Sequence, residues 1–317
     1  MDKKDHDDLR VFAGSESPEF AAKICKLLHI EPGRCEAHKF SEGNTFVRIL
    51  ENVRGRDTYI IQTMSGAVND QFMELLFWVD AFRRASAKEV TAVIPFFSYA
   101  KGDKKDEPRV SIRARVCADC LEAAGADRVL TMDLHAPQIQ GFFRITVDHL
   151  YAQPVLVDHF RSEVNDDWVV VAPDVGFGEQ ARRFARALGL EYVVGEKTRP
   201  GHDERAEVLR IIGDVEGKTC LMVDDFVISG GTLIATADKL LENGATAVYA
   251  AVSHGVLPAD AVQRIQDSAI QRLVVTDTIE RRNVAKPENI DVVSVAPLFA
   301  RAIHNIHHRT SISELFD

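Results

Sequence analysis

The chain has 317 residues, which is enough for two domains of ordinary size. It carries 38 Lys and Arg against 48 Asp and Glu, and its formal net charge of −10 argues against a general nucleic-acid binder or an anionic-membrane binder. No apolar run approaches the roughly 18 residues that a membrane-spanning helix needs, and the charged start MDKKDHDDLR is unlike a secretory signal.

In the first half of the chain, short apolar runs alternate with helical patterns. Residues 35–49 contain stretches with the two-residue period of strands. The pattern predicts strands at 11–14, 58–62, 89–95 and 128–132, helices at 17–28, 68–85 and 112–124, and a polar loop at 98–111.

The second half repeats this alternation, which predicts parallel sheets covered by helices on both faces. We therefore expect an α/β protein with two similar domains, at 1–151 and 152–298, and a C-terminal segment 299–317 that packs back on the first. The predicted strands are 168–172, 192–195, 221–223, 247–252, 272–276 and 291–294; the helices are 153–164, 178–188 and 233–241; a polar loop follows at 196–205.

The five cysteines are scattered along the chain, and their spacing does not indicate a metal site or a disulfide framework. Cys117 and Cys120 form a CxxC motif, but they lie in an amphipathic helix pattern and lack the second pair that would complete a zinc site. We expect reduced core thiols in a cytoplasmic protein. The full set is Cys25, Cys35, Cys117, Cys120 and Cys220.

The stretch 221–232, LMVDDFVISGGT, organises the rest of the chain. An apolar run ends in Asp224 and Asp225, and a turn of small residues leads into a helix. Such a turn directs N–H groups at an anion, and Gly230 and Gly231 let the backbone approach it closely. The two carboxylates can accept hydrogen bonds from sugar hydroxyls, so a phosphorylated sugar is the expected ligand. The alternative is an ordinary strand–helix turn with aspartates that cap local N–H groups.

A second stretch, TMDLHAPQIQGFF at 131–143, places His135 just beyond a strand, where a histidine alone is more often structural. The 221–232 stretch resembles the phosphoribosyl-diphosphate loop of phosphoribosyltransferases and of ribose-phosphate pyrophosphokinases. The 131–143 segment is very close to the pyrophosphokinases alone. Further segments follow that family's order, at 13–15, 39–49, 53–55, 69–76, 103–106, 172–174 and 213–218.

The resemblance implies a fold of two phosphoribosyltransferase-type domains, each a mostly parallel sheet flanked by helices. It also implies an enzyme of nucleotide biosynthesis that transfers the β,γ-diphosphoryl group of ATP to the anomeric hydroxyl of ribose 5-phosphate. The products are 5-phosphoribosyl 1-diphosphate and AMP. Because such catalysis is mostly positioning and charge neutralisation, Mg²⁺ is the expected metal.

The family's functional residues carry over onto matching positions in this sequence. Ribose phosphate binding is implied for Asp224, Asp225, Ser229, Gly230, Gly231 and Thr232, and catalysis by a mobile basic flap for Lys197 and Arg199. ATP binding is implied for Phe40, Asn44, Lys101, Arg109 and His135, and the metal for His135 and Asp174. A regulatory phosphate or nucleotide site is implied for Arg54, Gln140, Ser311 and Ser313.

Each of these roles has a plainer alternative. Without the resemblance, Phe40 reads equally well as a strand core residue, and Asp174 reads as a helix N-cap. The loop 196–205 would be a solvated surface loop. In the family the adenine pocket is shared between subunits, which implies a homodimer or a homohexamer.

The sequence departs from the family pattern at several positions. Ile228 replaces an aspartate, Asn44 an acidic residue, and Phe177 a glycine. Lys101 and Gly102 replace Arg-Gln, and Pro137 and His149 replace small or amide residues. Two alternatives therefore stay open beside the main reaction: a pyrophosphokinase of this fold with another substrate, such as ADP-ribose or another nucleotide donor, and a non-catalytic regulatory homologue.

Overall fold

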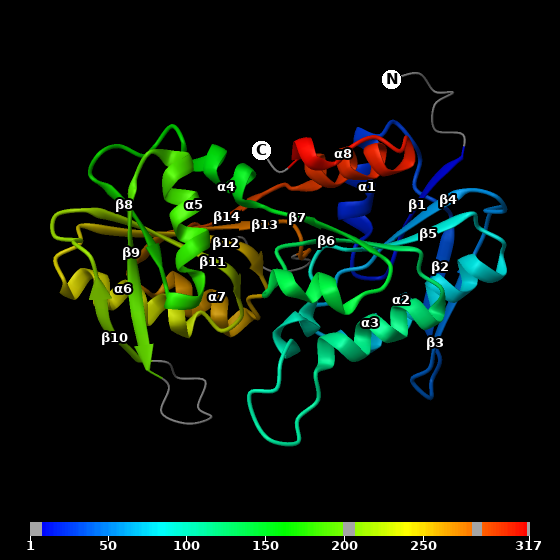
Figure 1. Ribbon diagram of the computed structural model, residues 1–317, viewed down its shortest axis with the longest axis horizontal. Helices are drawn as coiled ribbons and strands as arrows, with labels where there is room; N and C mark the ends of the chain where they lie inside the picture. The colour runs from blue at the N-terminus through cyan, green and yellow to red at the C-terminus, as the bar shows by residue number, and fades with distance from the viewer. Residues whose placement is uncertain (1–7, 199–206, 281–286, 316–317) are drawn as a thin grey trace. The chain divides into compact units, whose positions relative to one another are not determined.

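A computed structural model describes residues 8–198, 207–280 and 287–315, without the side chains of 197, 198 and 207–209 (Figure 1). The chain divides into two compact units, each with its own sheet and hydrophobic core. The first unit comprises Met1–Tyr151, Thr278–Glu280 and Val295–Asp317. The second comprises Ala152–Asp277 and Arg281–Ser294.

The first unit is built on a five-stranded parallel sheet in the order β1-β4-β5-β6-β7. Its inner strands are apolar because both faces are covered, and all five residues of β4 are buried. The strands are β1 (Leu9–Ala13), β4 (Asp57–Ile61), β5 (Glu89–Ile94), β6 (Arg128–Met132) and β7 (Thr146–Leu150).

Helices cover both faces of this sheet (Figure 1). On one face α1 packs against α8, where Phe20 meets Phe299 edge to face with ring centroids 5.3 Å apart. On the other face α2 packs against α3. The helices are α1 (Pro18–Leu27), α2 (Val68–Arg84), α3 (Arg113–Ala124) and α8 (Ala296–His307), with short 3-10 turns η1 (Ser98–Gly102), η2 (Pro137–Phe142) and η4 (Ser313–Leu315).

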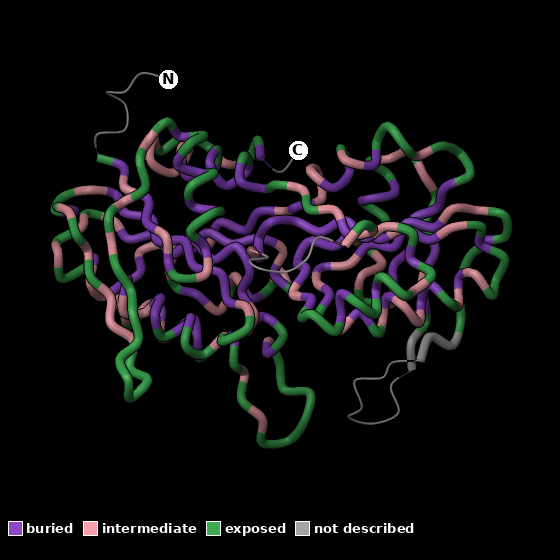
Figure 2. Tube along the Cα trace, turned by 180° about the vertical axis from the view of Figure 1, so that it is seen from behind, coloured by how far each residue is buried: buried purple, intermediate pink, exposed green. Residues whose placement is uncertain are grey.

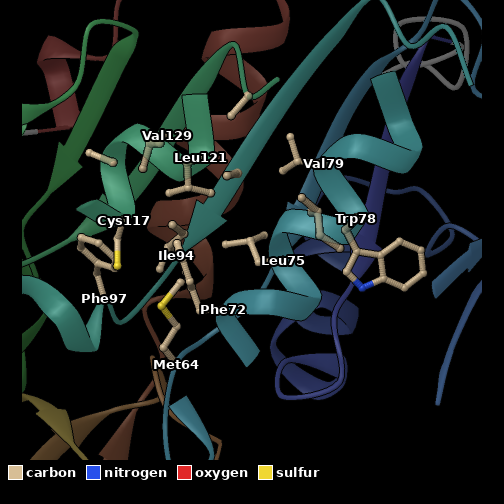
Figure 3. Close-up of a cluster of buried hydrophobic side chains, with 14 of the residues drawn as sticks. Met64, Phe72, Leu75, Trp78, Val79, Ile94, Phe97, Cys117, Leu121 and Val129 are labelled. Carbon is tan, nitrogen blue, oxygen red and sulfur yellow. The ribbon is translucent and has the colours of Figure 1, made fainter. Parts of the chain in front are cut away.

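The core beneath α2 and α3 is aromatic and closely packed (Figure 3). Trp78 and Phe82 of α2 lie one turn apart and are both fully buried, and Phe82 packs on Phe12 of β1 with centroids 4.7 Å apart. The apolar spacing that predicts α2 is therefore the spacing of its core face. In Figure 2 the buried segments run through the middle of each unit, while the outlying loops are exposed.

A separate antiparallel hairpin, β2 (Cys35–Lys39) and β3 (Thr45–Ile49), extends away from the sheet of the first unit (Figure 1). Most of its residues are exposed or half-buried, so it contributes little to the core. It contacts α2 through β3.

The second unit contains a seven-stranded sheet in the order β10-β9-β8-β11-β12-β13-β14. Every neighbouring pair is parallel except β9 with β10. The strands are β8 (Trp168–Ala172), β9 (Glu191–Thr198), β10 (Glu207–Ile212), β11 (Thr219–Val227), β12 (Ala247–Gly255), β13 (Ile270–Thr276) and β14 (Ile290–Val293).

Alternate strand residues of this sheet point to opposite faces. Val169, Cys220 and Met222 belong to the core that α6 and α7 cover. The helices are α4 (Gln153–Phe160), α5 (Gly178–Leu188), α6 (Gly231–Glu242) and α7 (Ala259–Gln266), with a 3-10 turn η3 (Val175–Phe177). Across the described ranges, no helix has both the length and the apolar character to cross a membrane.

The expected fold class is confirmed, and several element boundaries need correction. Strand β11 continues to Val227 rather than 223, since Phe226 and Val227 pair with β12. Strand β9 continues to Thr198 rather than 195, because antiparallel pairing with β10 satisfies its polar backbone. Helix α4 ends at Phe160 rather than 164. Strands β7 and β10 were not predicted at all.

Candidate functional site

The loop between β11 and α6 has the geometry of an anion site. Gly230 is the N-cap of α6 and has φ of +76°, and a Cβ there would lie 2.9 Å from Ile265 Cδ1. Only glycine fits this position without strain. Helix α6 then starts at Gly231, so Gly231 and Thr232 belong to its first turn rather than to the preceding turn.

The N–H groups of this loop are largely unused by the protein. Gly231 N–H donates a long bond of 3.5 Å to Ser229 Oγ. Within the part of the chain that the structure describes, no protein acceptor is recorded for the N–H groups of Ile228, Ser229, Gly230 and Thr232. A helix N-terminus with unpaired N–H groups and a positive dipole end favours a negatively charged ligand.

The two neighbouring carboxylates lie within β11, just before this loop. Asp225 is 9% exposed and its Oδ1 accepts the N–H of Phe226 at 2.8 Å. Asp224 is half-buried and its Oδ1 accepts the N–H of Asp225 at 3.0 Å. The N–H of the following residue therefore fixes each carboxylate, as the alternative of local capping also predicts. The two carboxylates also place oxygen acceptors beside the loop.

Asp174 lies at the corresponding end of the neighbouring strand β8. Val171 pairs with Met222, so Asp174 and Asp225 each lie three residues beyond a paired position. Its Oδ1 accepts the N–H of Phe177 at 3.1 Å, which makes it the N-cap of η3. Asp174 is half-buried, and the capping role that the sequence left open is present in the structure.

The predicted basic flap is described only in part. The backbone of Lys197 lies in β9, in register with Val208 of β10, so this residue belongs to an antiparallel strand pair rather than to a loop. Arg199 lies outside the described residues.

In the first unit, His135 is exposed and lies just beyond β6. The backbone before it bends sharply, because Asp133 has φ of +38°, which is uncommon for a residue with a side chain. Asp133 N–H donates to Leu150 O at 3.0 Å, which fixes the bend to β7. The structure thus presents an imidazole at the carboxyl end of the sheet, where open α/β sheets bind ligands.

Lys101 and Arg109 are exposed on the segment that follows β5. Lys101 lies in η1, and Arg109 has φ of +68°. Beside Lys101, Gly102 is buried, and a Cβ there would lie 2.6 Å from Arg113 Nε and 2.8 Å from its Cβ. Close packing against Arg113 therefore explains why Gly102 stands where the family has Gln, which the sequence did not reveal.

Phe40 lies at the exposed end of the hairpin and is 43% exposed, so it is not a core residue. Its ring contacts His38 at 5.0 Å and Phe46 at 5.9 Å between centroids. Asn44 closes the turn, since Phe40 N–H donates to Asn44 O at 2.8 Å. An exposed, supported aromatic ring can stack on a flat ligand.

The four residues predicted to be regulatory lie in three separate segments of the first unit. Ser311 and Ser313 lie together near the C-terminus, with their hydroxyl oxygens 3.0 Å apart. Arg54 is exposed on the loop before β4, and Gln140 is half-buried in η2. No recorded contact among the described residues brings Arg54 or Gln140 to the two serines.

The cysteines are free thiols. Burial raises the pKa of Cys117 to about 12, which makes it inert as a metal ligand or nucleophile at neutral pH. Among the described residues there is no group of three or more His, Cys, Asp and Glu that could hold a metal ion.

Known proteins match this chain along almost its whole length. Residues 9–125 match the family model described as the N-terminal domain of ribose phosphate pyrophosphokinase, and residues 200–317 match the phosphoribosyl synthetase-associated domain. The ribose-phosphate pyrophosphokinase of Caldanaerobacter subterraneus subsp. tengcongensis is 47% identical over 309 residues, 97% of this chain and 98% of the relative. That of Bacillus subtilis is 43% identical over 309 residues, 98% of this chain and 97% of the relative.

A solved structure agrees with these sequence matches. The crystal structure of phosphoribosylpyrophosphate synthetase from Mycobacterium smegmatis is similar with a TM-score of 0.88 and 38% sequence identity. The similarity covers 95% of this chain and 99% of that chain.

Proposed function

We propose how this chain, which belongs to the ribose-phosphate pyrophosphokinase family, carries out that family's reaction. The chain is an enzyme, a ribose-phosphate diphosphokinase. It transfers the β,γ-diphosphoryl group of ATP to the anomeric hydroxyl of ribose 5-phosphate. The products, 5-phosphoribosyl 1-diphosphate and AMP, belong to nucleotide biosynthesis.

The observation that carries the site assignment is the loop from Ile228 to Thr232. Apart from the long bond from Gly231 to Ser229 Oγ, its N–H groups have no protein acceptor within the described residues, and they stand at a helix N-terminus, which suits the 5-phosphate. Asp224 and Asp225 precede it, and their carboxylates suit the ribose hydroxyls. A phosphate and a vicinal diol in one ligand fit this pairing of donors and acceptors better than either group alone.

The ATP side is assigned to the first unit. The triphosphate is negatively charged, and Lys101, Arg109 and His135 are exposed groups that can donate to it. The exposed ring of Phe40 offers a stacking surface for adenine, with Asn44 beside it at the hairpin turn.

Catalysis is assigned to Lys197 and Arg199. The attack of the anomeric hydroxyl on the β-phosphorus of ATP must be in line, and negative charge spreads over the transferring group. Two cations beside that group would neutralise the charge and exclude water that would hydrolyse ATP.

The family needs a metal ion, and we assign it as Mg²⁺. The Asp174 carboxylate is the kind of oxygen donor that Mg²⁺ prefers, and this ion usually keeps several waters and takes phosphate oxygens of the substrate. The residues that would hold it are His135 and Asp174. When bound, the ion would neutralise charge on the triphosphate.

A homodimer or homohexamer is part of the proposal. The hairpin extends away from the five-stranded sheet of the first unit (Figure 1), and the exposed Phe40 beside its turn can reach a second subunit. A regulatory phosphate or nucleotide site at Arg54, Gln140, Ser311 and Ser313 is supported mainly by the adjacent hydroxyls of the two serines. The free thiols fit the reducing cytoplasm.

The test is incubation of the full chain with ATP and Mg²⁺, and with either ribose 5-phosphate or ADP-ribose. We expect AMP and 5-phosphoribosyl 1-diphosphate in equal amounts with ribose 5-phosphate, measured by ion-exchange chromatography. AMP release with ADP-ribose alone would indicate the altered acceptor instead. No AMP release with either sugar would favour a non-catalytic homologue. The relatives that match this chain end to end at 43–47% identity favour neither the altered acceptor nor the non-catalytic homologue.

A further inference from the structure

His149 is a buried histidine on β7 that no proposed step of the reaction uses. It is 4% exposed and pairs in register with Thr131 of β6, directly beside the strand end that leads to His135. Its Nε2 accepts the backbone N–H of Leu134 at 2.9 Å. A side chain of β7 thus binds the backbone of the loop that follows the neighbouring strand β6.

This hydrogen bond supports a loop in an unfavourable conformation. Asp133 has φ of +38°, and Leu134 is only 6% exposed, so its N–H is removed from water. A buried N–H without an acceptor is destabilising, and the loop would open to find one. The His149 imidazole supplies that acceptor one residue before His135.

The same ring also contacts the segment after His135. The side-chain amide of Gln140 lies 3.2 Å from Nδ1 of His149 and donates to Pro137 O at 3.0 Å. The Tyr151 ring packs on the imidazole with centroids 4.5 Å apart. His149 therefore contacts the chain on both sides of His135, through Leu134 and through Gln140.

The geometry fixes the protonation of the ring. A backbone N–H can only donate, so Nε2 of His149 must carry the lone pair. The imidazole is then neutral, with its proton on Nδ1. Because the Gln140 amide nitrogen is also a donor, its 3.2 Å approach to Nδ1 is a packing contact and not a hydrogen bond. An apolar residue at this position could fill the space but could not accept from Leu134, whereas a side-chain amide could.

We propose that His149 is a positioning residue of the nucleotide site, which holds the backbone immediately before His135 and packs against the Gln140 side chain after it, so that the exposed imidazole meets the triphosphate in one orientation. This inference rests on the proposed role of His135 in ATP binding. Residues that orient a group in contact with substrate typically affect function by about tenfold or more when replaced.

Three variants of the full chain test the proposal. His149→Phe keeps a ring but removes the acceptor, and His149→Gln restores a neutral acceptor. His159→Phe makes the same change in the second unit, at a half-buried histidine whose Nε2 has no partner within the described residues. The readouts are kcat and the KM values for ATP and for ribose 5-phosphate, with the affinity for a non-hydrolysable ATP analogue from calorimetry.

We expect His149→Phe to lower kcat/KM for ATP and the analogue affinity by about tenfold, with the KM for ribose 5-phosphate changed less than twofold. His149→Gln should recover most of the loss, and His159→Phe should behave as the parent. Equal losses toward both substrates, or no difference between the Phe and Gln variants, would overturn the proposal.

Two measurements separate this inference from the proposed function. If the parent makes no AMP, the proposed reaction fails, yet analogue binding still compares the three variants. Histidine-selective ¹⁵N NMR of the parent gives the tautomer even if His149→Phe does not fold. A proton on Nδ1 is expected, and a proton on Nε2 would overturn the proposal.

Discussion

Asp57 and His307 lie 250 positions apart in the chain, yet His307 Nδ1 is 2.9 Å from Asp57 Oδ2. The contact joins the last turn of α8 to the start of β4, and both side chains are about nine-tenths buried. Lys88 adds a second contact, with Nζ 3.0 Å from Asp57 Oδ1. The C-terminal helix is thereby held on the first unit by a polar anchor as well as by its apolar face.

This anchor predicts a pH-dependent stability. Burial by itself raises the pKa of Asp57, but hydrogen bonds from His307 and Lys88 outweigh it, so the pKa is below its ordinary value. A carboxyl with a depressed pKa stabilises the fold above its unfolded pKa of about 4, and this stability is lost as pH falls through the folded value. We expect Asp57→Asn to lower the free energy of unfolding by about 1 to 3 kcal/mol at pH 7.

The measurement is urea unfolding of the parent and of Asp57→Asn between pH 7 and pH 3. The difference between the two proteins should shrink as pH falls below the unfolded pKa of Asp57 toward its lower folded pKa. A difference that stays constant over this range would mean that the ionised carboxyl contributes nothing. Asp80→Asn, in an exposed i,i+4 pair with Arg84, is the matched control and should change stability little.

Much of the fold follows from local sequence patterns. Strand β8 and helix α5 begin and end where the sequence predicts, because β8 is uniformly apolar and Gly189 ends α5 in the left-handed conformation with φ of +73°. Strand β7 could not be predicted, since two of its three buried residues are polar and are satisfied only by distant partners. Asp148 pairs with Arg128 at 2.6 Å, and His149 accepts from Leu134.

The candidate site was predictable to a similar degree. Residue types at strand ends predict Asp174, Asp225 and His135 near the carboxyl ends of the sheets, where the structure has them. What periodicity does not reveal is support from residues remote in sequence. The packing of Gly102 against Arg113 and the hydrogen bond from Leu134 to His149 follow from the three-dimensional structure and not from the sequence pattern.

Lys197→Ala should affect turnover far more than ATP binding. If the ammonium group neutralises charge that develops in the transition state, its loss lowers kcat by about a hundredfold while the KM for ATP changes little. Steady-state kinetics with varied ATP measures both. Lys239→Ala removes a partly exposed lysine that pairs with Glu242 on α6, and it should leave both constants unchanged. Equal changes in kcat and in ATP affinity would contradict a transition-state role.

Asp225→Asn should weaken sugar binding selectively. An asparagine oxygen can still accept the N–H of Phe226, so the strand end is preserved, but the charge that strengthens hydrogen bonds from ribose hydroxyls is lost. We expect the KM for ribose 5-phosphate to rise about tenfold or more, with the KM for ATP nearly unchanged. Asp238→Asn, on the exposed side of α6, is the control. An unaltered KM for ribose 5-phosphate would remove the basis for assigning this loop.

Gly230→Ala and Gly231→Ala form a matched pair within one loop. At Gly230 the added Cβ meets Ile265 Cδ1 at 2.9 Å and φ is +76°, whereas at Gly231 the nearest atom is Ser229 Oγ at 3.7 Å. Because the left-handed conformation costs about 1 to 2 kcal/mol for a residue with a side chain, Gly230→Ala should be the less stable variant by at least that amount. Thermal unfolding of the two variants measures the difference. If the strain distorts the N–H groups that face the phosphate, the KM for ribose 5-phosphate should rise in Gly230→Ala while the KM for ATP does not. Equal stability of the two variants would show that the loop does not hold Gly230 in this conformation.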